Sequence, residues 1–157
     1  MTDTNLPLDD IDRRILNALQ IDASQTNSEL AQEVHVSPPT CLRRVKQLTA
    51  TGVIARQVAI VAPEKVGARL TAIVEISLDV QAAERMDEFE ARVAGEDAVL
   101  QCYRVAPGPD FVLIVQVTDM PAYHALAHRL FATQANVRNV KAYFSTFRSK
   151  FETRIVI

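Results

Sequence analysis

The sequence predicts an α+β protein in which helices come first and an antiparallel β-sheet comes second. In the N-terminal part, apolar side chains recur at spacings of three and four, as on one face of a helix. In the C-terminal part they alternate at a spacing of two, in segments separated by further helical patterns. The pattern changes near residues 58–69, where Pro63 and Gly67 interrupt it. We therefore expect two domains, residues 1–62 and residues 63–157.

Composition limits the classes of protein that this chain can represent. Its 157 residues are 48% apolar, which is enough for one ordinary core or two small ones. The net charge of −2 means that a polyanion could be attracted only by local clusters of basic residues. Cys41 and Cys102 are too few for a disulfide framework and lack zinc-site spacing, so we expect both to be buried. Without a secretion signal or a long apolar run, we expect a cytoplasmic protein with no membrane partner.

Two helices are predicted at the start of the chain. The first is opened by acidic residues that suit a helix N-terminus, Asp9, Asp10 and Asp12. Its apolar face consists of Leu8, Ile11, Ile15 and Leu19. The second helix runs from about Ser28 to Val34, and its buried side consists of Leu30, Ala31 and Val34. Both patterns have the helical period, so we expect the two faces to pack into one small core.

The third helix begins after a short turn of His35, Val36 and Ser37. Ser37 is a typical N-cap and Pro38 suits the first helical position, while Gly52 marks the end. A step of 100° per residue puts an apolar stripe on one side, Cys41, Leu42, Val45 and Leu48. The opposite side carries Thr40, Arg43 and Gln47, with Lys46 beside them. The following segment VIARQVAIV is predicted to be a strand, which completes the order of a winged helix-turn-helix domain.

This third helix lies in a basic stretch that contains no carboxylate. Residues 34–63 include no Asp or Glu but carry four cations, Arg43, Arg44, Lys46 and Arg56. Cations can approach phosphates there without anionic neighbours, so double-stranded DNA is the predicted partner. The predicted DNA-binding residues are Ser37, Pro38, Thr40, Arg43, Arg44, Lys46, Gln47, Arg56 and Gln57. Two alternatives remain: a solvated helix that merely lacks acids, and a helical head that contacts protein instead of DNA.

The C-terminal part contains two β-α-β units of similar length, at about residues 70–106 and 111–147. Their predicted strands are LTAIVEISLDV, VLQCYRVA, FVLIVQV and VRNVKAYFSTF, and helices run from about Ala82 to Ala94 and from Asp119 onward. This order predicts a ferredoxin-like βαββαβ domain, with an antiparallel sheet and both helices on one side. The open face of the sheet would carry Ile73, Val112 or Val115, and Tyr143. An apolar open face favours a homodimer formed through the sheets.

Together these segments resemble the Lrp/AsnC family, the leucine-responsive or "feast/famine" transcription regulators. The resemblance is carried by LDDIDRRILNALQIDA, by SELAQEVHVSPPTCLRRVKQLTATGVI and by APGPDFVLIVQVTDM, and it extends from about Leu8 to Lys150. It implies a dimer joined through the C-terminal sheets and assembly of dimers into an octamer or a similar disc. It also implies an amino-acid effector that binds where dimers meet.

The resemblance also suggests which residues bind the effector. Gly108 would expose backbone amides to the α-carboxylate, and Asp110 would pair with the α-ammonium. The remaining positions are Arg104, Met120, Tyr143, Phe144 and Ser145. Met120 and Phe144 would form an adaptable apolar pocket, which favours leucine or methionine as the effector. The alternative is that Gly108, its flanking prolines and Asp110 only form a turn.

Nothing in the sequence supports an enzyme or a resident cofactor. His124 and His128 are four residues apart on a predicted helix, but no third metal ligand is evident, so we predict no metal site. Paired acids such as Asp9 with Asp10 stand at helix starts, where the helix dipole accounts for them. A small ligand-binding enzyme on a ferredoxin-like scaffold remains as a third hypothesis, which the turnover of an amino acid would support.

Overall fold

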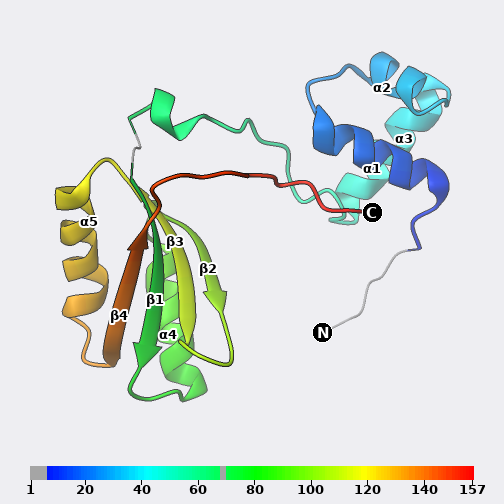
Figure 1. Cartoon of the computed structure of the whole chain (residues 1–157). Helices are drawn as coiled ribbons and strands as arrows, with labels where there is room; N and C mark the ends of the chain where they lie inside the picture. The colour runs from blue at the N-terminus through cyan, green and yellow to red at the C-terminus, as the bar shows by residue number, and fades with distance from the viewer. Residues whose placement is uncertain (1–6, 68–69) are drawn as a thin grey trace. The chain divides into compact units, whose positions relative to one another are not determined.

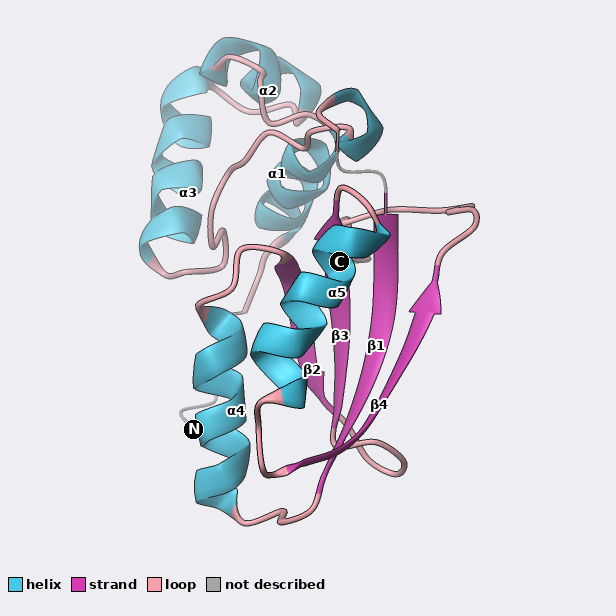
Figure 2. Cartoon of the chain, turned by 90° about the vertical axis from the view of Figure 1, so that its left-hand side faces the viewer, coloured by secondary structure: helices cyan, strands magenta, loops and turns pink. Residues whose placement is uncertain are grey.

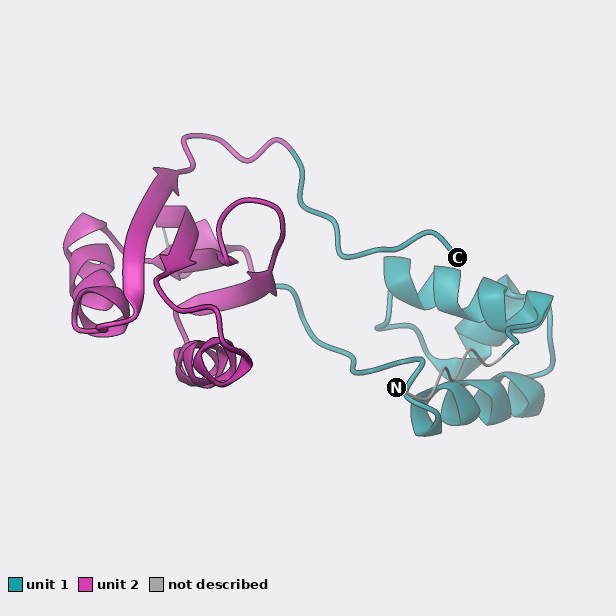
Figure 3. Ribbon diagram, turned by 90° about the horizontal axis from the view of Figure 1, so that it is seen from below, with its two compact units in different colours: residues 1–60, 150–157 teal, residues 61–149 magenta. Residues whose placement is uncertain are grey.

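The computed structural model describes residues 7–67 and 70–157 of the chain. It consists of two compact units, residues 1–60 with 150–157 and residues 61–149 (Figure 3). The predicted second domain ran unbroken to residue 157, so the grouping of residues 150–157 with the helical unit differs from that expectation. Two hydrogen bonds hold this tail: Gln20 Nε2 donates to the Ile155 carbonyl (3.2 Å), and the Ile155 N–H donates to Gln20 Oε1 (2.8 Å). Ile157 packs against the apolar core of the same unit.

The first unit contains the three predicted helices, α1 (Asp10–Ile21), α2 (Asn27–Glu33) and α3 (Pro38–Ala50). Each begins at a side chain that accepts a backbone N–H, namely Asp9, Thr26 and Ser37. The capping box at Asp9 is reciprocal, because Asp12 N donates to Asp9 Oδ1 (2.9 Å) and Asp9 N donates to Asp12 Oδ2 (3.3 Å). The buried core residues are Ile15, Leu16, Ala18, Leu30, Ala31, Val34, Cys41 and Leu48.

The predicted strand after α3 is absent. Residues 53–62 contain no β-strand, and from residue 55 onward this stretch is exposed. An extended segment becomes a strand only when a neighbour pairs with its backbone, and no described residue of the chain does so. The helix-turn-helix part of the prediction is confirmed, whereas the strand of the wing was wrong for this chain by itself.

The second unit has a four-stranded sheet in the order β2-β3-β1-β4 (Figure 1). After the short 3₁₀-helix η1 (Pro63–Lys65), its elements are β1 (Leu70–Leu78), α4 (Ala83–Ala94), β2 (Val99–Arg104), β3 (Phe111–Val117), α5 (Met120–Ala127), the short π-helix η2 (His128–Ala132) and β4 (Val137–Phe144). All neighbouring strands are antiparallel. Helices α4 and α5 cover the same face (Figure 2). The ferredoxin-like arrangement is therefore confirmed.

The two faces of the sheet differ in burial. Alternate residues of β1 and β3 are fully buried against the helices, namely Ala72, Val74, Ile76, Leu78, Phe111, Leu113 and Val115. The open face carries a row in which Ile73 lies opposite Ile114 on one side and Tyr143 on the other. Within the single chain, Ile73 and Tyr143 are 40% and 51% exposed. Of the two valines proposed for this face, Val112 lies there, half-buried, and Val115 does not.

The two cysteines have different surroundings. Cys41 lies in the core of the helical unit as predicted, and this burial raises the pKa of its thiol. Cys102 was also expected to be buried, but it is exposed because all of β2, an edge strand, is exposed except Val99. None of the helices in the described part of the chain is long and apolar enough to cross a bilayer.

Candidate functional site

Three polar side chains stand on the outward face of α3. Arg43, Lys46 and Gln47 are exposed, and Cys41 and Leu48 anchor the opposite side of the helix in the core. Within the described residues, neither Arg43 nor Lys46 takes part in an ion pair. Their charges are thus available to an external anion. This side of α3 can present cations and an amide to the major groove.

Ser37 and Thr40 form the start of α3. The two hydroxyl oxygens lie 2.8 Å apart in a hydrogen bond, and Ser37 Oγ accepts the Thr40 N–H (3.4 Å). The Pro38 carbonyl accepts a hydrogen bond from Asn27 Nδ2 (2.9 Å), which ties the start of α3 to that of α2. These contacts orient the helix. Thr40 is only partly exposed, and its hydroxyl is already hydrogen-bonded to that of Ser37, so in this chain it helps to hold the start of α3.

Arg44 points away from the outward face. Its Nη1 lies 2.8 Å from Asp9 Oδ2 and 3.3 Å from Asp12 Oδ2, at the start of α1. The Arg44 side chain is 22% exposed and that of Asp12 only 11%. We predicted Arg44 as a DNA-binding residue from its place in the basic stretch, but here it neutralises two carboxylates of its own domain. It therefore does not belong to the outward row of α3, by which we mean the exposed side chains of Arg43, Lys46 and Gln47.

The apolar stripe of α3 is narrower than predicted. Leu42 is 44% exposed although it was assigned to the buried side. On the helical wheel it lies 100° from Cys41, at the edge of the stripe, and the three-helix core does not reach that far. Arg56 and Gln57 are exposed in the irregular segment after α3. They are accessible to a ligand but are not carried on a strand.

Asp110 is used inside the fold. It is 7% exposed, its Oδ2 accepts the Leu78 N–H (2.6 Å), and its own N–H donates to the Ile76 carbonyl (2.8 Å). The side chain therefore completes the hydrogen bonding of β1 at its end. This differs from the predicted pairing with a ligand ammonium. Gly108, in the same loop, has a φ of +123°, which explains the glycine, and the peptide bond before Pro107 is cis.

Arg104 is also occupied. Its Nη2 lies 2.8 Å from Asp87 Oδ1 and its Nε 2.9 Å from Glu90 Oε1, both on α4. Hydrogen bonds to Glu90 and then to Asp87 raise the pKa of the guanidinium further. In this chain Arg104 therefore links β2 to α4, and its role at an effector stays a prediction.

The other predicted effector residues lie toward the opposite end of the sheet. Phe144 is in register with Ala72, whereas Phe111, next to the Asp110 loop, is in register with Ile76. Four residues of strand separate these positions by about 13 Å. Met120 starts α5, and the Ser145 N–H donates to the Thr71 carbonyl (2.9 Å). The chain by itself therefore does not gather the predicted residues into one site.

Tyr143 and Phe144 are further divided between the two faces. Phe144 packs edge-on against Tyr123 on the helix side, with ring centroids 4.9 Å apart. Tyr143 lies on the open face, where its hydroxyl donates to Glu75 Oε2 (3.4 Å). Consecutive strand residues point in opposite directions, so one chain cannot turn both rings toward the same ligand.

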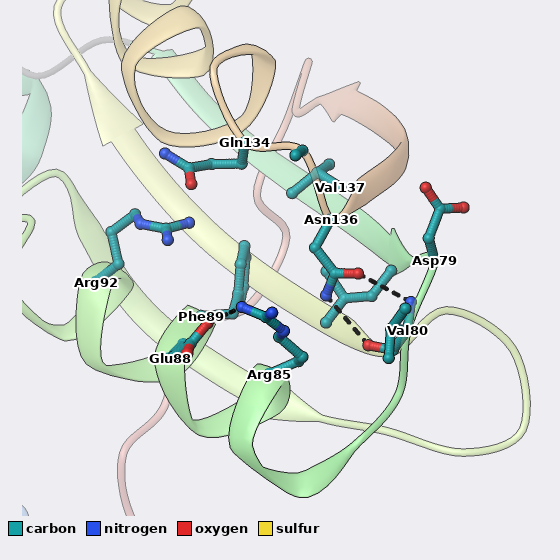
Figure 4. A pocket seen from close by; sticks show the side chains of 11 residues that line it. Asp79, Val80, Arg85, Glu88, Phe89, Arg92, Gln134, Asn136 and Val137 are labelled. Carbon is teal, nitrogen blue, oxygen red and sulfur yellow. Dashed lines mark hydrogen bonds and ion pairs between the residues drawn. The ribbon is translucent and has the colours of Figure 1, made fainter.

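Two shallow hollows in the second unit were not identified from the sequence. The first, which we call the helix-face hollow, has a volume of about 390 Å³ and lies between α4, the end of β1 and residues 134–137 (Figure 4). The second, of about 380 Å³, includes Ser145 but none of the other predicted effector residues. A sequence signal for the first existed, because Arg85, Phe89 and Arg92 recur at helical spacing on α4. Within the described residues, no group of three or more possible metal ligands is present.

Comparison with known proteins gives matches over nearly the whole chain. Residues 8–49 match the AsnC-type helix-turn-helix domain, and residues 71–155 match the Lrp/AsnC ligand binding domain. An uncharacterized HTH-type transcriptional regulator of Haemophilus influenzae is 37% identical over 96% of this chain and 89% of its own length. The leucine-responsive regulatory protein of Salmonella typhimurium is 35% identical over 96% of this chain and 92% of its own.

Solved structures agree with these matches. An AsnC family transcriptional regulator from Agrobacterium tumefaciens superimposes with a TM-score of 0.89 at 32% identity, covering 94% of this chain and 96% of that one. A Neisseria meningitidis transcriptional regulator in complex with L-Met gives a TM-score of 0.88 at 31% identity, with the same coverage of each chain. The chain therefore belongs to the Lrp/AsnC family: it is a DNA-binding transcriptional regulator, not an enzyme, with a helix-turn-helix domain followed by a ligand-binding domain.

Proposed function

We propose that the protein binds specific DNA sequences through the outward row of α3 and that an amino acid, leucine or methionine, regulates this binding. The observation that carries the proposal is the contrast between two adjacent arginines. Arg44 is paired inside the domain, whereas Arg43 is exposed and, with Lys46 and Gln47, forms a row without carboxylates. Such a regulator would act in the cytoplasm, on chromosomal DNA.

The row has the chemistry needed to read a sequence. An arginine can donate two hydrogen bonds to guanine, and a glutamine can pair in the same way with adenine. Arg43 and Gln47 are four residues apart, so they project from the same side of α3 and can reach neighbouring base pairs. Lys46 on α3 and Arg56 after it would contact phosphates, which gives affinity without sequence preference.

The DNA-binding proposal is tested on the intact protein with an operator duplex obtained by selection from random DNA. Fluorescence anisotropy at several salt concentrations would give both the affinity and its salt dependence. We expect Arg43→Ala to cost about 1–3 kcal/mol on the operator and to relax the preference at one base pair. Lys46→Ala should weaken binding to all DNA sequences about equally, and it should reduce the slope of log affinity against log salt concentration by about 1. Unchanged affinity and preference in Arg43→Ala would show that α3 does not read the bases through this residue.

Support for an amino-acid effector comes from the domain match and from a similar regulator crystallised with L-Met. The predicted effector residues are divided between the two ends of the sheet. We therefore propose that a complete effector site requires residues of more than one chain, as expected where dimers meet. An effector that binds such a site acts by favouring one assembly state over another.

The open face of the sheet supports self-association. Ile73, Ile114 and Tyr143 form an apolar row across three strands, and a second copy of the same face would cover it with twofold symmetry. We propose a dimer formed in this way and, from the family resemblance, assembly of dimers into an octamer. The two DNA-binding domains of a dimer would then read two half-sites.

Sedimentation and calorimetry test the effector proposal. Leucine or methionine should change the distribution of oligomers or the affinity for the operator. Its apparent affinity should also depend on protein concentration, because assembly and binding are linked. Titration with lysine serves as the control, because the side chain of lysine ends in a charged ammonium group and not in an apolar group. If neither leucine nor methionine alters assembly or DNA affinity, the effector assignment is wrong while the DNA-binding proposal stands.

A further inference from the structure

One guanidinium at the helix-face hollow has no partner among the residues that the structure describes. Arg92 of α4 lines the hollow and is partly buried, yet within the described residues no hydrogen bond or ion pair engages its guanidinium. The neighbouring arginines are paired: Arg85 lies 2.9 Å from Glu88 Oε2, Arg104 contacts two carboxylates of α4, and Arg129 pairs with Glu96. The nearby acids are thus largely neutralised, and Arg92 keeps its charge.

An apolar floor lies beside this cation. Phe89 and Leu78 are only 2% and 1% exposed, so the free apolar surface of the lining belongs mainly to Val80, which is 52% exposed, and to the half-buried Val137 (Figure 4). Figure 4 shows Arg92 and Arg85 on either side of Phe89. A cation beside a hydrophobic surface matches a ligand that has a carboxylate at one end and an alkyl chain at the other.

The rim of the hollow is held in place before any ligand binds. Asn136 Oδ1 accepts the Val80 N–H (2.9 Å), and Asn136 Nδ2 donates to the Val80 carbonyl (3.1 Å). This pair joins the end of β1 to the start of β4. A preformed rim reduces the ordering cost of binding. The volume of about 390 Å³ is at the small end of ligand pockets, which suits a molecule of five to six carbons, roughly.

We propose that the helix-face hollow is a second ligand site, which binds small carboxylates with an apolar chain of about leucine size. Arg92 holds the carboxylate in a two-pronged hydrogen bond, and Val80 and Val137 contact the chain. The site lies within a single chain and thus goes beyond the effector site proposed where dimers meet. Two acids also line the hollow: Glu88, which is paired with Arg85, and Asp79, which is turned away from Arg92 in Figure 4. An ammonium group on the ligand is therefore not required.

Calorimetric titration of the full-length protein with 4-methylpentanoate tests this inference. We expect saturable binding to the wild type that is at least tenfold weaker for Arg92→Gln and partly retained in Arg92→Lys. The neutral 4-methylpentanamide should bind at least tenfold more weakly than the acid, because it has the same chain but no charge. The matched control is Arg138→Gln, which removes an exposed arginine of β4 outside the hollow and should leave binding unchanged.

A second variant shows whether a loss of binding comes from the hollow itself or from a folding defect of Arg92→Gln. Arg92 is in the last turn of α4, where a cation also stabilises the helix, so Arg92→Gln could lower stability. Ala135 is exposed at the hollow, and Ala135→Phe should block it without disturbing the core. The inference is overturned if 4-methylpentanoate fails to bind, if the amide binds equally well, or if Arg92→Gln and Ala135→Phe both bind like the wild type.

Discussion

Replacing Arg44 with alanine should destabilise the helical unit while leaving the DNA affinity of the folded protein nearly unchanged. The substitution removes the cation that contacts Asp9 at 2.8 Å and Asp12 at 3.3 Å. Asp12 would then keep a carboxylate that is only 11% exposed, without its ionic partner. The adjacent substitution Arg43→Ala removes an exposed side chain and should do the reverse, lowering DNA affinity with little change in stability.

The size of the effect follows from the exposure of the three side chains. Fully exposed pairs contribute about 0–1 kcal/mol, and removing one partner of a fully buried pair costs about 3–5 kcal/mol. Here the side-chain exposures are 22% for Arg44, 46% for Asp9 and 11% for Asp12. We therefore expect an intermediate loss of about 1–3 kcal/mol in the free energy of unfolding. For a unit of this size, the corresponding drop in Tm is roughly 5–20 °C.

The loss should also depend on pH. The N–H of Asp12 is the main cause that lowers the pKa of Asp9, and the charge of Arg44 lowers it further. A carboxyl with a lowered folded-state pKa stabilises the fold above its unfolded pKa, and this stabilisation disappears as the pH falls through the folded value. The stability difference between wild type and Arg44→Ala should therefore shrink below about pH 4.

Urea unfolding followed by circular dichroism measures the free energy of unfolding of Arg44→Ala and Arg43→Ala. Fluorescence anisotropy with the operator measures the DNA affinity of the same two variants. Surface changes such as Arg43→Ala normally alter stability by about 0.5 kcal/mol or less. A stability loss within that limit for Arg44→Ala would contradict the proposed role of Arg44 as the partner of Asp9 and Asp12. So would a loss of operator affinity as large as that of Arg43→Ala in protein that is still folded. A double-mutant cycle of Arg44→Ala with Asp12→Ala would measure the pairwise part of the loss.

Three further substitutions test other features of the fold. His35 has a left-handed backbone with a φ of 56°, so His35→Val should lower stability by about 1–2 kcal/mol in a thermal melt, whereas His35→Asn should be nearly neutral. Gln20→Ala removes both hydrogen bonds to Ile155 and should cost about 1 kcal/mol, with faster proteolysis of residues 150–157; equal proteolysis rates would contradict the role of this pair. Asp110→Ala leaves the buried Leu78 N–H without its acceptor and should cost about 1.5–3 kcal/mol in urea, and Asp110→Asn should cost less because it retains an acceptor.

The local signals in the sequence predicted most of the fold. Ser37 and Pro38 start α3 as expected, because a cap and a fixed φ act within one helical turn. FVLIVQV matches β3 residue for residue, although its open-face side chains are only half-buried within one chain. The strand expected after α3 failed because a strand needs a backbone partner, and alternation of side chains does not supply one.

The candidate sites were predicted less completely, for a related reason. Arg43 and Arg44 are adjacent and chemically identical, and a basic stretch gives no basis for separating their roles. Asp110 could equally well have faced a ligand or the backbone. The deciding contacts join residues that are 32 positions apart in both cases, Arg44 with Asp12 and Leu78 with Asp110.

The sequence by itself determined the helices of the first domain, the four-stranded order of the second and, through its motifs, the family. These follow from periodicity and from capping, which depend on neighbours within a few residues. Only the tertiary structure decided which charges remain available: Arg43, Lys46 and Arg92 lack internal partners among the described residues, whereas Arg44, Arg104 and Asp110 have them. The physical reason is that a charge is neutralised by whatever the fold brings within about 4 Å, at any distance along the chain.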